Sequence, residues 1–94
     1  MADLTGRSLQ VSIVSAEEQL WSGTARQIVA KTLEGEIGIL AGHQPILAIL
    51  AEGGQVRVTT TEGSVITANA DDGFLSVDHD TVTVVARNAS LVEA

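Results

Sequence analysis

The sequence predicts an all-β domain, an antiparallel sandwich or barrel, and three observations lead to this fold class. Apolar and polar residues alternate with a period of two in several short runs, which is typical of strands with one face on a core. Turn-forming residues separate these runs at short intervals, as they do in sandwiches and barrels. β-branched residues are plentiful along the whole chain, and a pleated surface favours them.

The first half of the chain contains five expected strands, at 8–14, 17–22, 25–31, 36–40 and 46–51. The first of them shows the alternation clearly, because Leu9, Val11 and Ile13 are separated by polar residues. Turn signals lie at 22–23 and at 41–45. Residues 46–51 are apolar on both faces, a pattern that a helix also shows, but so short a run between turn signals favours a doubly buried strand.

The second half contains five more expected strands, at 55–60, 64–69, 73–77, 81–87 and 88–92. Val56 and Val58 alternate with polar residues in the first of these, and Val82 and Val84 do so in the fourth. Turn signals lie at 52–54, 61–63, 71–73 and 78–80. The chain is therefore expected to form about ten short strands.

Composition limits what the chain does. Its 94 residues make one domain, and only Trp21 and Phe74 are aromatic, so Val, Ile, Leu and Ala must build the core. The formal charge is −7 and the five basic residues are scattered, so a phosphate backbone or an anionic membrane would be repelled. The chain has no cysteine, no apolar stretch of transmembrane length and no signal peptide at 1–7. We therefore expect an intracellular protein that does not bind nucleic acid.

The densest groups of titratable residues fit turns better than active sites. In a hairpin turn the side chains of Asp78, His79 and Asp80 would splay into solvent, which is poor geometry for holding a metal. The run 71–73 lacks the further oxygens of a calcium loop. No serine lies in a nucleophile elbow, and the glycine-containing run 35–38 lacks the Lys-Ser/Thr of a phosphate loop. The sequence therefore predicts no catalytic residue, no metal site and no cofactor.

The middle of the chain has the most unusual composition. The twelve residues that start at Glu34 contain three glycines, one proline, two acids and a histidine. Gly35 and Gly42 suit bends that require a positive φ. The product should be a stiff edge that bears Glu34, Glu36 and His43. On a domain without an active site, a shaped and charged edge indicates a docking surface, while a turn without a function is the alternative that the residues leave open.

Three stretches carry a resemblance to a known family. They are Gly35-Glu36-Ile37-Gly38-Ile39-Leu40 followed by Gly42-His43-Gln44-Pro45-Ile46-Leu47, then Val14-Ser15-Ala16-Glu17-Glu18-Gln19-Leu20-Trp21-Ser22-Gly23, and lastly Gly73-Phe74-Leu75-Ser76-Val77 with Val82-Thr83-Val84-Val85-Ala86. In order and spacing they resemble the ε subunit of F-type ATP synthases (δ in mitochondria) over residues 9 to 89. This implies a flattened ten-stranded antiparallel sandwich of two five-stranded sheets. Ala41 replaces a usual proline, which should loosen that corner, and Asp72 replaces the first glycine of a usual pair, which should change that turn.

The resemblance also implies a function. Subunits of this family are non-catalytic parts of the central stalk that dock on the γ subunit and on the polar loops of the c-ring, and so couple ion-driven rotation to ATP synthesis. Carried over position by position, Glu34, Glu36 and His43 fall on the edge that faces the c-ring loops, which usually carry arginine. The γ contact should be broader and more apolar.

The same resemblance implies a location and an extent. The chain should lie at the cytoplasmic face of the bacterial inner membrane, or at the stromal face of the thylakoid, and should touch the membrane only through the complex. Most members continue into a C-terminal helical hairpin linked to inhibition of ATP hydrolysis. Here a single domain at 1–94 is expected without that hairpin.

Two other classes of protein remain as alternatives. A lipoyl or biotinyl carrier is also a small acidic β-sandwich, but it needs a lysine at a hairpin tip, and the only lysine, Lys31, lies in an expected strand. A small hydrolase or metal enzyme would have to use His43 or His79, for which the sequence offers no accompanying residues.

Overall fold

A computed structural model describes residues 8–92, and these residues form strands and turns without a helix. The strands are β1 (Leu9–Ser15), β2 (Gln19–Thr32), β3 (Gly35–Leu40), β4 (Ile46–Ile49), β5 (Gln55–Thr60), β6 (Val65–Asp78) and β7 (Thr81–Val92). The expected all-β class is therefore confirmed. Within this described part of the chain, no helix is long and apolar enough to cross a membrane. The expectations about a signal peptide at 1–7 and about the chain's end at 93–94 lie outside the described residues.

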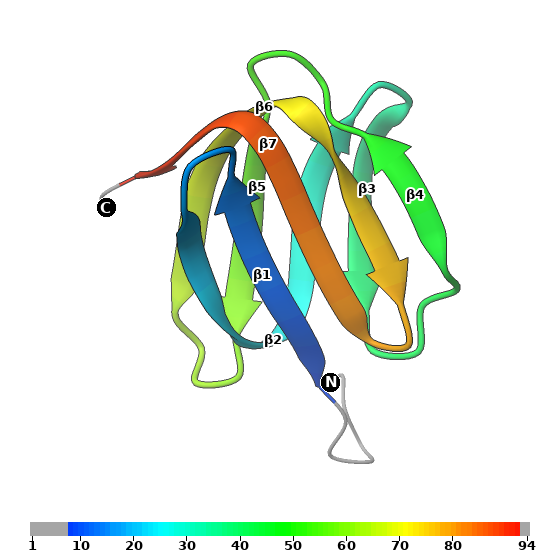
Figure 1. The fold of residues 1–94 in the computed structure, drawn as a ribbon. Coiled ribbons are helices and arrows are strands. Elements are labelled where there is room, and N and C mark those ends of the chain that lie inside the picture. Colours follow the sequence, from blue (N-terminus) through cyan, green and yellow to red (C-terminus); the bar gives the residue numbers. More distant parts are fainter. Residues whose placement is uncertain (1–7, 93–94) are drawn as a thin grey trace.

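All seven strands belong to one hydrogen-bonded sheet, which runs in the order β1-β7-β6-β5-β2-β3, with β4 added on β6. A further pairing between β1 and β2 closes five of these strands into a ring. Figure 1 shows this ring, with β3 and β4 on the same side of the molecule. Every neighbouring pair is antiparallel except β1 and β7, which are parallel. Because β3 pairs only with β2 and β4 only with β6, these two are the edge strands.

The expected count of ten strands in two five-stranded sheets is wrong for this structure, which has seven strands in one sheet. Three expected pairs of short strands are single long strands, namely β2, β6 and β7. The turn signal at 22–23 does not end β2, because Gly23 stays paired with Val11. The signal at 71–73 does not end β6 either, because Gly73 stays opposite Ala86. Asp72, with a φ of 62°, forms the bend, and the hydrogen-bonded pairing of β6 with β7 continues on both sides of it.

The long strands pass from one layer of the sandwich to the other. The first half of β2 pairs with β1, and its second half pairs with β3 and β5. The first half of β6 pairs with β5, and its second half pairs with β4. Each layer is therefore joined to the other through continuous backbone, as the curved strands in Figure 1 show. The described chain measures 35 × 27 × 20 Å along its principal axes.

The core lies between the two layers and consists of aliphatic side chains, as the composition predicts. Its fully buried large members are Leu9, Val11, Ile13, Ile28, Ile39, Val56, Val58, Leu75, Val77, Val82 and Val84. Neither aromatic residue belongs to this set, since Trp21 only packs against the core and Phe74 is exposed. The expectation of a doubly buried strand at 46–51 is also wrong. One face of β4 is turned to solvent, because Leu47 is 69% exposed and Ile49 53%.

Candidate docking surfaces

The turn between β2 and β3 presents Glu34 and is held by the buried side chain of Thr32. The Thr32 hydroxyl donates a hydrogen bond of 2.7 Å to the Gly35 carbonyl oxygen and accepts one of 3.2 Å from the Glu34 N–H. Gly35 has a φ of 122°, so the sequence-based expectation of a positive φ is confirmed. These contacts fix the backbone that carries Glu34, while the Glu34 side chain is exposed.

Glu36 lies at the start of edge strand β3, with its side chain on the outer face of the sheet. It pairs in register with Lys31 of β2, and its Oε2 lies 3.7 Å from Nη2 of Arg57. Both side chains of this ion pair are more than half exposed, at 63% for Glu36 and 54% for Arg57. Such a pair contributes only about 0–1 kcal/mol, so a stronger partner can displace Arg57.

His43 lies in the corner at 41–45, which joins β3 to β4. Gly42 has a φ of 88°, which confirms the second sequence-based expectation of a positive φ. The His43 N–H donates to the Leu40 carbonyl at 3.1 Å, and His43 Nδ1 lies 2.7 Å from the Gln44 carbonyl oxygen. In addition, the Gly42 N–H donates to Oδ1 of Asp80 at 2.7 Å. The corner that Ala41 should loosen therefore has several hydrogen bonds that hold it.

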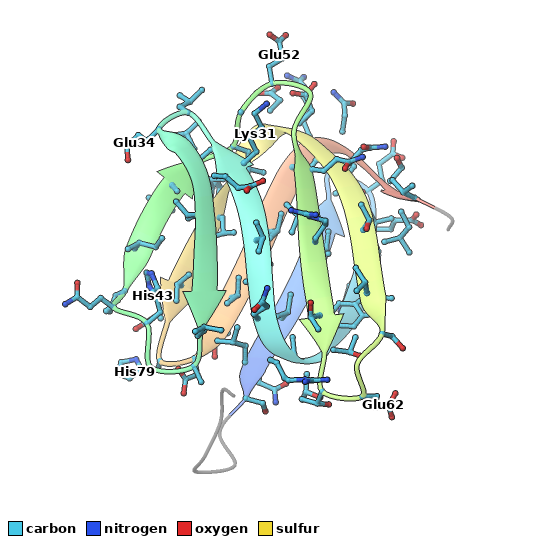
Figure 2. The ribbon with its side chains drawn as sticks, turned by 180° about the vertical axis from the view of Figure 1, so that it is seen from behind. Lys31, Glu34, His43, Glu52, Glu62 and His79 are labelled. Carbon is cyan, nitrogen blue, oxygen red and sulfur yellow. The ribbon has the colours of Figure 1, made fainter. Side chains whose placement is uncertain are left out.

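The structure separates the three expected docking residues into two groups. Glu34 lies in the turn just before β3 and Glu36 near its beginning, whereas His43 follows its end. Figure 2 shows Glu34 with Lys31 and Glu52 at the upper end of the molecule, His43 lower down on the same side as Glu34, and Glu62 at the lower end. We call Glu34 and Glu36, together with the neighbouring Glu52, the acidic end. The three expected residues therefore lie in or beside edge strand β3 but do not form one site.

Glu52 was missed as a docking candidate because its surroundings indicated only a turn. That turn is tied to the acidic end by a backbone hydrogen bond of 3.0 Å from the Ala51 N–H to the Lys31 carbonyl. Glu52 is exposed and its side chain points outward (Figure 2). The only signal in the sequence was an acid beside two glycines. Such a local pattern cannot show that the turn lies next to Lys31, twenty residues earlier in the chain.

A row of apolar side chains crosses the outer face of the other layer. Ile49 of β4 pairs with Phe74 of β6, Phe74 pairs with Val85 of β7, and Val85 pairs with Val14 of β1. Ile49 is 53% exposed and Phe74 39%. We call these four residues the outer apolar row; the exposed Leu47 lies two residues from Ile49 on the same face of β4. The sequence shows apolar residues at both odd and even positions of these strands. Only the register of the strand pairs shows which of them lie side by side.

The remaining candidates are structural. Asp78, His79 and Asp80 end β6 in the tight turn that the sequence predicts, where His79 and Asp80 have φ values of 50° and 60°. His79 Nδ1 lies 2.7 Å from Asp78 Oδ1, and both side chains are exposed. Lys31 lies within β2 instead of at a hairpin tip, so the carrier alternative has no support. Among residues 8–92, no three side chains gather that could hold a metal ion.

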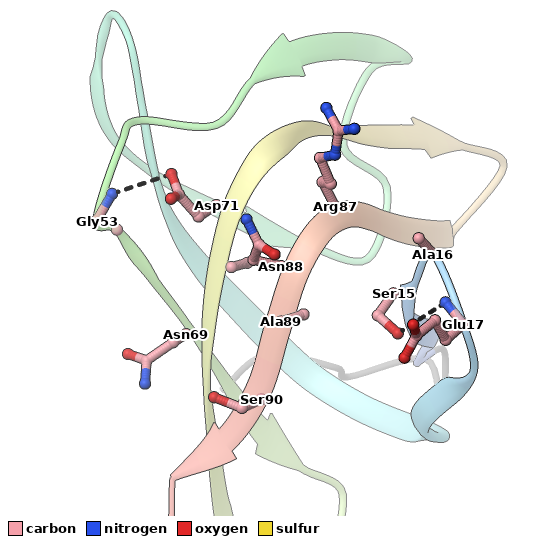
Figure 3. A pocket seen from close by; sticks show the side chains of 12 residues that line it. Ser15, Ala16, Glu17, Gly53, Asn69, Asp71, Arg87, Asn88, Ala89 and Ser90 are labelled. Carbon is pink, nitrogen blue, oxygen red and sulfur yellow. Dashed lines mark hydrogen bonds between the residues drawn. The ribbon is translucent and has the colours of Figure 1, made fainter.

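A hollow with a volume of about 620 Å³ is lined by small and polar residues (Figure 3). Two of its polar side chains accept hydrogen bonds from the backbone of turns. Asp71 Oδ1 accepts a hydrogen bond of 3.2 Å from the Gly53 N–H, and the Ser15 hydroxyl accepts one of 3.2 Å from the Glu17 N–H. The hollow contains no histidine or lysine beside its acids. It therefore offers no convergent set of groups for acid–base or nucleophilic chemistry.

Comparison with known proteins identifies close relatives. The family model described as "ATP synthase, Delta/Epsilon chain, beta-sandwich domain" matches residues 8–92. The ATP synthase epsilon chain of Micrococcus luteus is 52% identical over 86 residues, which cover 92% of this chain and 93% of the relative. The epsilon chain of Rhodococcus opacus is 47% identical over 93 residues, covering 99% of this chain and 72% of the relative.

A solved structure shares the fold. It is the OSCP/F1/c-ring assembly of the Euglena gracilis mitochondrial ATP synthase, in which one chain matches with a TM-score of 0.82 and 23% identity. The match covers 97% of this chain and 60% of that chain, so this chain spans little more than half of its length. At this identity the likeness concerns the fold alone.

Proposed function

Because the chain belongs to the ATP synthase delta/epsilon family, whose β-sandwich domain it matches over residues 8–92, we propose that it couples rotation of the c-ring to the γ subunit. It is a non-catalytic ATP synthase subunit of the epsilon type. The observation that carries this function is the 52% identity to an ATP synthase epsilon chain over 92% of this chain. Two chemically different surfaces, the acidic end and the outer apolar row, support a subunit that contacts two partners.

The acidic end is the surface that we propose for the c-ring. The structure with the matching fold contains a c-ring, and the polar loops of such rings usually carry arginine according to the family resemblance. Glu34, Glu36 and Glu52 are exposed, and a carboxylate and a guanidinium form charge-assisted hydrogen bonds. Since an exposed pair contributes only about 0–1 kcal/mol, these contacts orient the subunit more than they hold it.

The outer apolar row is the surface that we propose for the γ subunit. Stable interfaces have an apolar centre, and exposed Ile49 and Phe74 with the neighbouring Leu47 supply one. The outer face of the layer that contains β2, β3 and β5 is less suited to an apolar interface. Its outward-facing positions carry the charged residues Lys31, Glu36 and Arg57. His43 belongs to the corner that leads into β4, so the corner and the outer apolar row can contact one partner.

The strand arrangement suits a part that transmits torque. β2 and β6 each contribute to both layers, so sliding one layer over the other would bend covalent backbone as well as break hydrogen bonds. The β1–β2 pairing removes the free edge that an open sheet would have there. A load applied at the acidic end thus reaches the opposite end through a stiff body.

As part of the ATP synthase, the subunit is a peripheral component of a membrane-associated complex. We place it at the cytoplasmic face of the bacterial inner membrane, in contact with the membrane only through its partners. Its negative formal charge of −7 supports this arrangement, because an anionic lipid surface would repel it.

The test of the c-ring surface is the charge reversal Glu36→Arg. We expect it to weaken attachment to a reconstituted γ–c-ring assembly by about threefold to tenfold, because one exposed ion pair is replaced by a repulsion. Coupling of proton pumping to ATP hydrolysis in vesicles should fall in parallel. The unfolding midpoint should change little, since Glu36 is 63% exposed.

Glu62→Arg is the matched control, because Glu62 is an exposed acid at the opposite end of the molecule (Figure 2). It should bind and couple like the unchanged protein. Equal attachment and equal coupling for Glu36→Arg and the unchanged protein would exclude the acidic end as the c-ring contact.

A further inference from the structure

A side-chain hydrogen bond ties the corner at 41–45 to a turn that is distant in the sequence. The Gly42 N–H donates to Oδ1 of Asp80 at 2.7 Å, across 38 residues. A short bond from an amide to a carboxylate is among the stronger hydrogen bonds in proteins. Gly42 has a φ of 88°, which only glycine adopts readily. Without the hydrogen bond to Asp80, this glycine backbone could adopt many other conformations.

Asp80 is itself held firmly in place. It is the last residue of the tight turn between β6 and β7, and both His79 and Asp80 have positive φ values. Its carbonyl oxygen accepts a hydrogen bond of 2.8 Å from the N–H of Gln10 in β1. The carboxylate that reaches Gly42 is thus anchored to three strands of the closed ring, β1, β6 and β7.

The corner lacks a restraint that the family resemblance leads one to expect. Ala41 stands at a position where a proline would fix φ near −65°. The other hydrogen bonds of the corner, from His43 to Leu40 and Gln44, are local and would move with it. The bond to Asp80 is different in kind, because it connects the corner to the rigid ring.

We propose that Asp80 is a positioning residue for the docking corner, and that its carboxylate supplies through Gly42 the rigidity that a proline at position 41 would supply. It places His43 relative to β4 without touching the partner itself. This inference deepens the proposed function and rests on it where it concerns docking on the γ subunit.

The first experiment is amide hydrogen exchange at Gly42, measured by NMR on the isolated chain. Asp80→Gly removes the carboxylate and suits the positive φ, so the exchange rate at Gly42 should rise about tenfold or more. Asp80→Asn keeps an acceptor oxygen and should stay within about threefold of the unchanged protein. Asp78→Asn is the control, because Asp78 contacts His79 and not the corner. An unchanged Gly42 exchange rate in Asp80→Gly would overturn the tether.

The second experiment separates positioning from mere stability. Binding of the chain to the isolated γ subunit should weaken severalfold in Asp80→Gly, and adding Ala41→Pro should restore it while the Gly42 amide remains unprotected. If Asp80→Gly binds γ normally although Gly42 exchanges fast, the docking role is wrong. If the unchanged chain does not bind γ, the proposed function fails together with that role, whereas the exchange data still decide the tether.

Discussion

Two strand backbones lie close together at Gly73, where no side chain separates them, and this leads to a sharp prediction about stability. Gly73 lies in β6 opposite Ala86 of β7. A Cβ added at Gly73 would lie 1.9 Å from the Val85 carbonyl oxygen and 2.6 Å from the Ala86 Cα. Ordinary contacts begin at about 3.4 Å, so Gly73→Ala must push β6 and β7 apart by more than 1 Å at this point.

The free energy lost when β6 and β7 separate at this point follows from the interactions between the two strands. About two ladder hydrogen bonds would be lost, at about 1 kcal/mol each, and the packing of buried Leu75 and Ala86 would loosen. We expect a loss of about 3–5 kcal/mol in the free energy of unfolding. A chain of this length has roughly 5–14 kcal/mol in total, so the loss would lower the melting temperature by at least about 12 °C.

The assay is urea unfolding followed by the fluorescence of Trp21, with Gly38→Ala as the matched control. Gly38 also lies in a strand, but apart from Gly38 and its two chain neighbours no atom lies within 4 Å of the position its Cβ would take. That variant should stay within about 1 kcal/mol of the unchanged protein. If Gly73→Ala proved as stable as Gly38→Ala, the reasoning from backbone proximity would be refuted.

Two further predictions concern the turn at the acidic end and the surface proposed for the γ subunit. Thr32→Val should cost about 1–3 kcal/mol of unfolding free energy and speed amide exchange at Glu34, since both hydroxyl bonds of that turn are lost; equal exchange rates would contradict this. Ile49→Asp should weaken binding to γ at least tenfold without unfolding the chain, because Ile49 is 53% exposed. Val65→Asp, at a residue 57% exposed on the opposite layer, should bind γ normally, and equal weakening by both variants would exclude the outer apolar row.

Local patterns predicted the fold class but not the number of strands. Alternation placed Leu9, Val11 and Ile13 in the core, where they are. The glycines at 23 and 73 read as turn signals, yet both lie inside strands whose ladders continue. Whether a glycine ends a strand depends on whether the neighbouring strand continues alongside it. That neighbour lies elsewhere in the chain, so no local pattern contains the information.

The proposed docking residues show a similar limit. The sequence correctly predicted positive φ values at Gly35 and Gly42, while the docking role of Glu34, Glu36 and His43 stays a prediction. Their closeness in the chain suggested one site, but an extended strand of six residues spans about 20 Å and therefore separates its ends. The outer apolar row, in contrast, consists of residues far apart in the sequence that only the cross-strand register brings together.

The parallel pairing of β1 with β7 sets the order in which the molecule can assemble. β1 leaves the ribosome first and has only β2 as a partner until β7 has been made. Closing the ring then joins residues about seventy positions apart, and folds dominated by such distant pairings form in milliseconds to seconds. Until β7 pairs with it, one side of β1 is an unpaired edge that can bind another chain. Variants that slow the pairing of β1 with β7 should therefore aggregate more, even when all contacts of their folded state are intact.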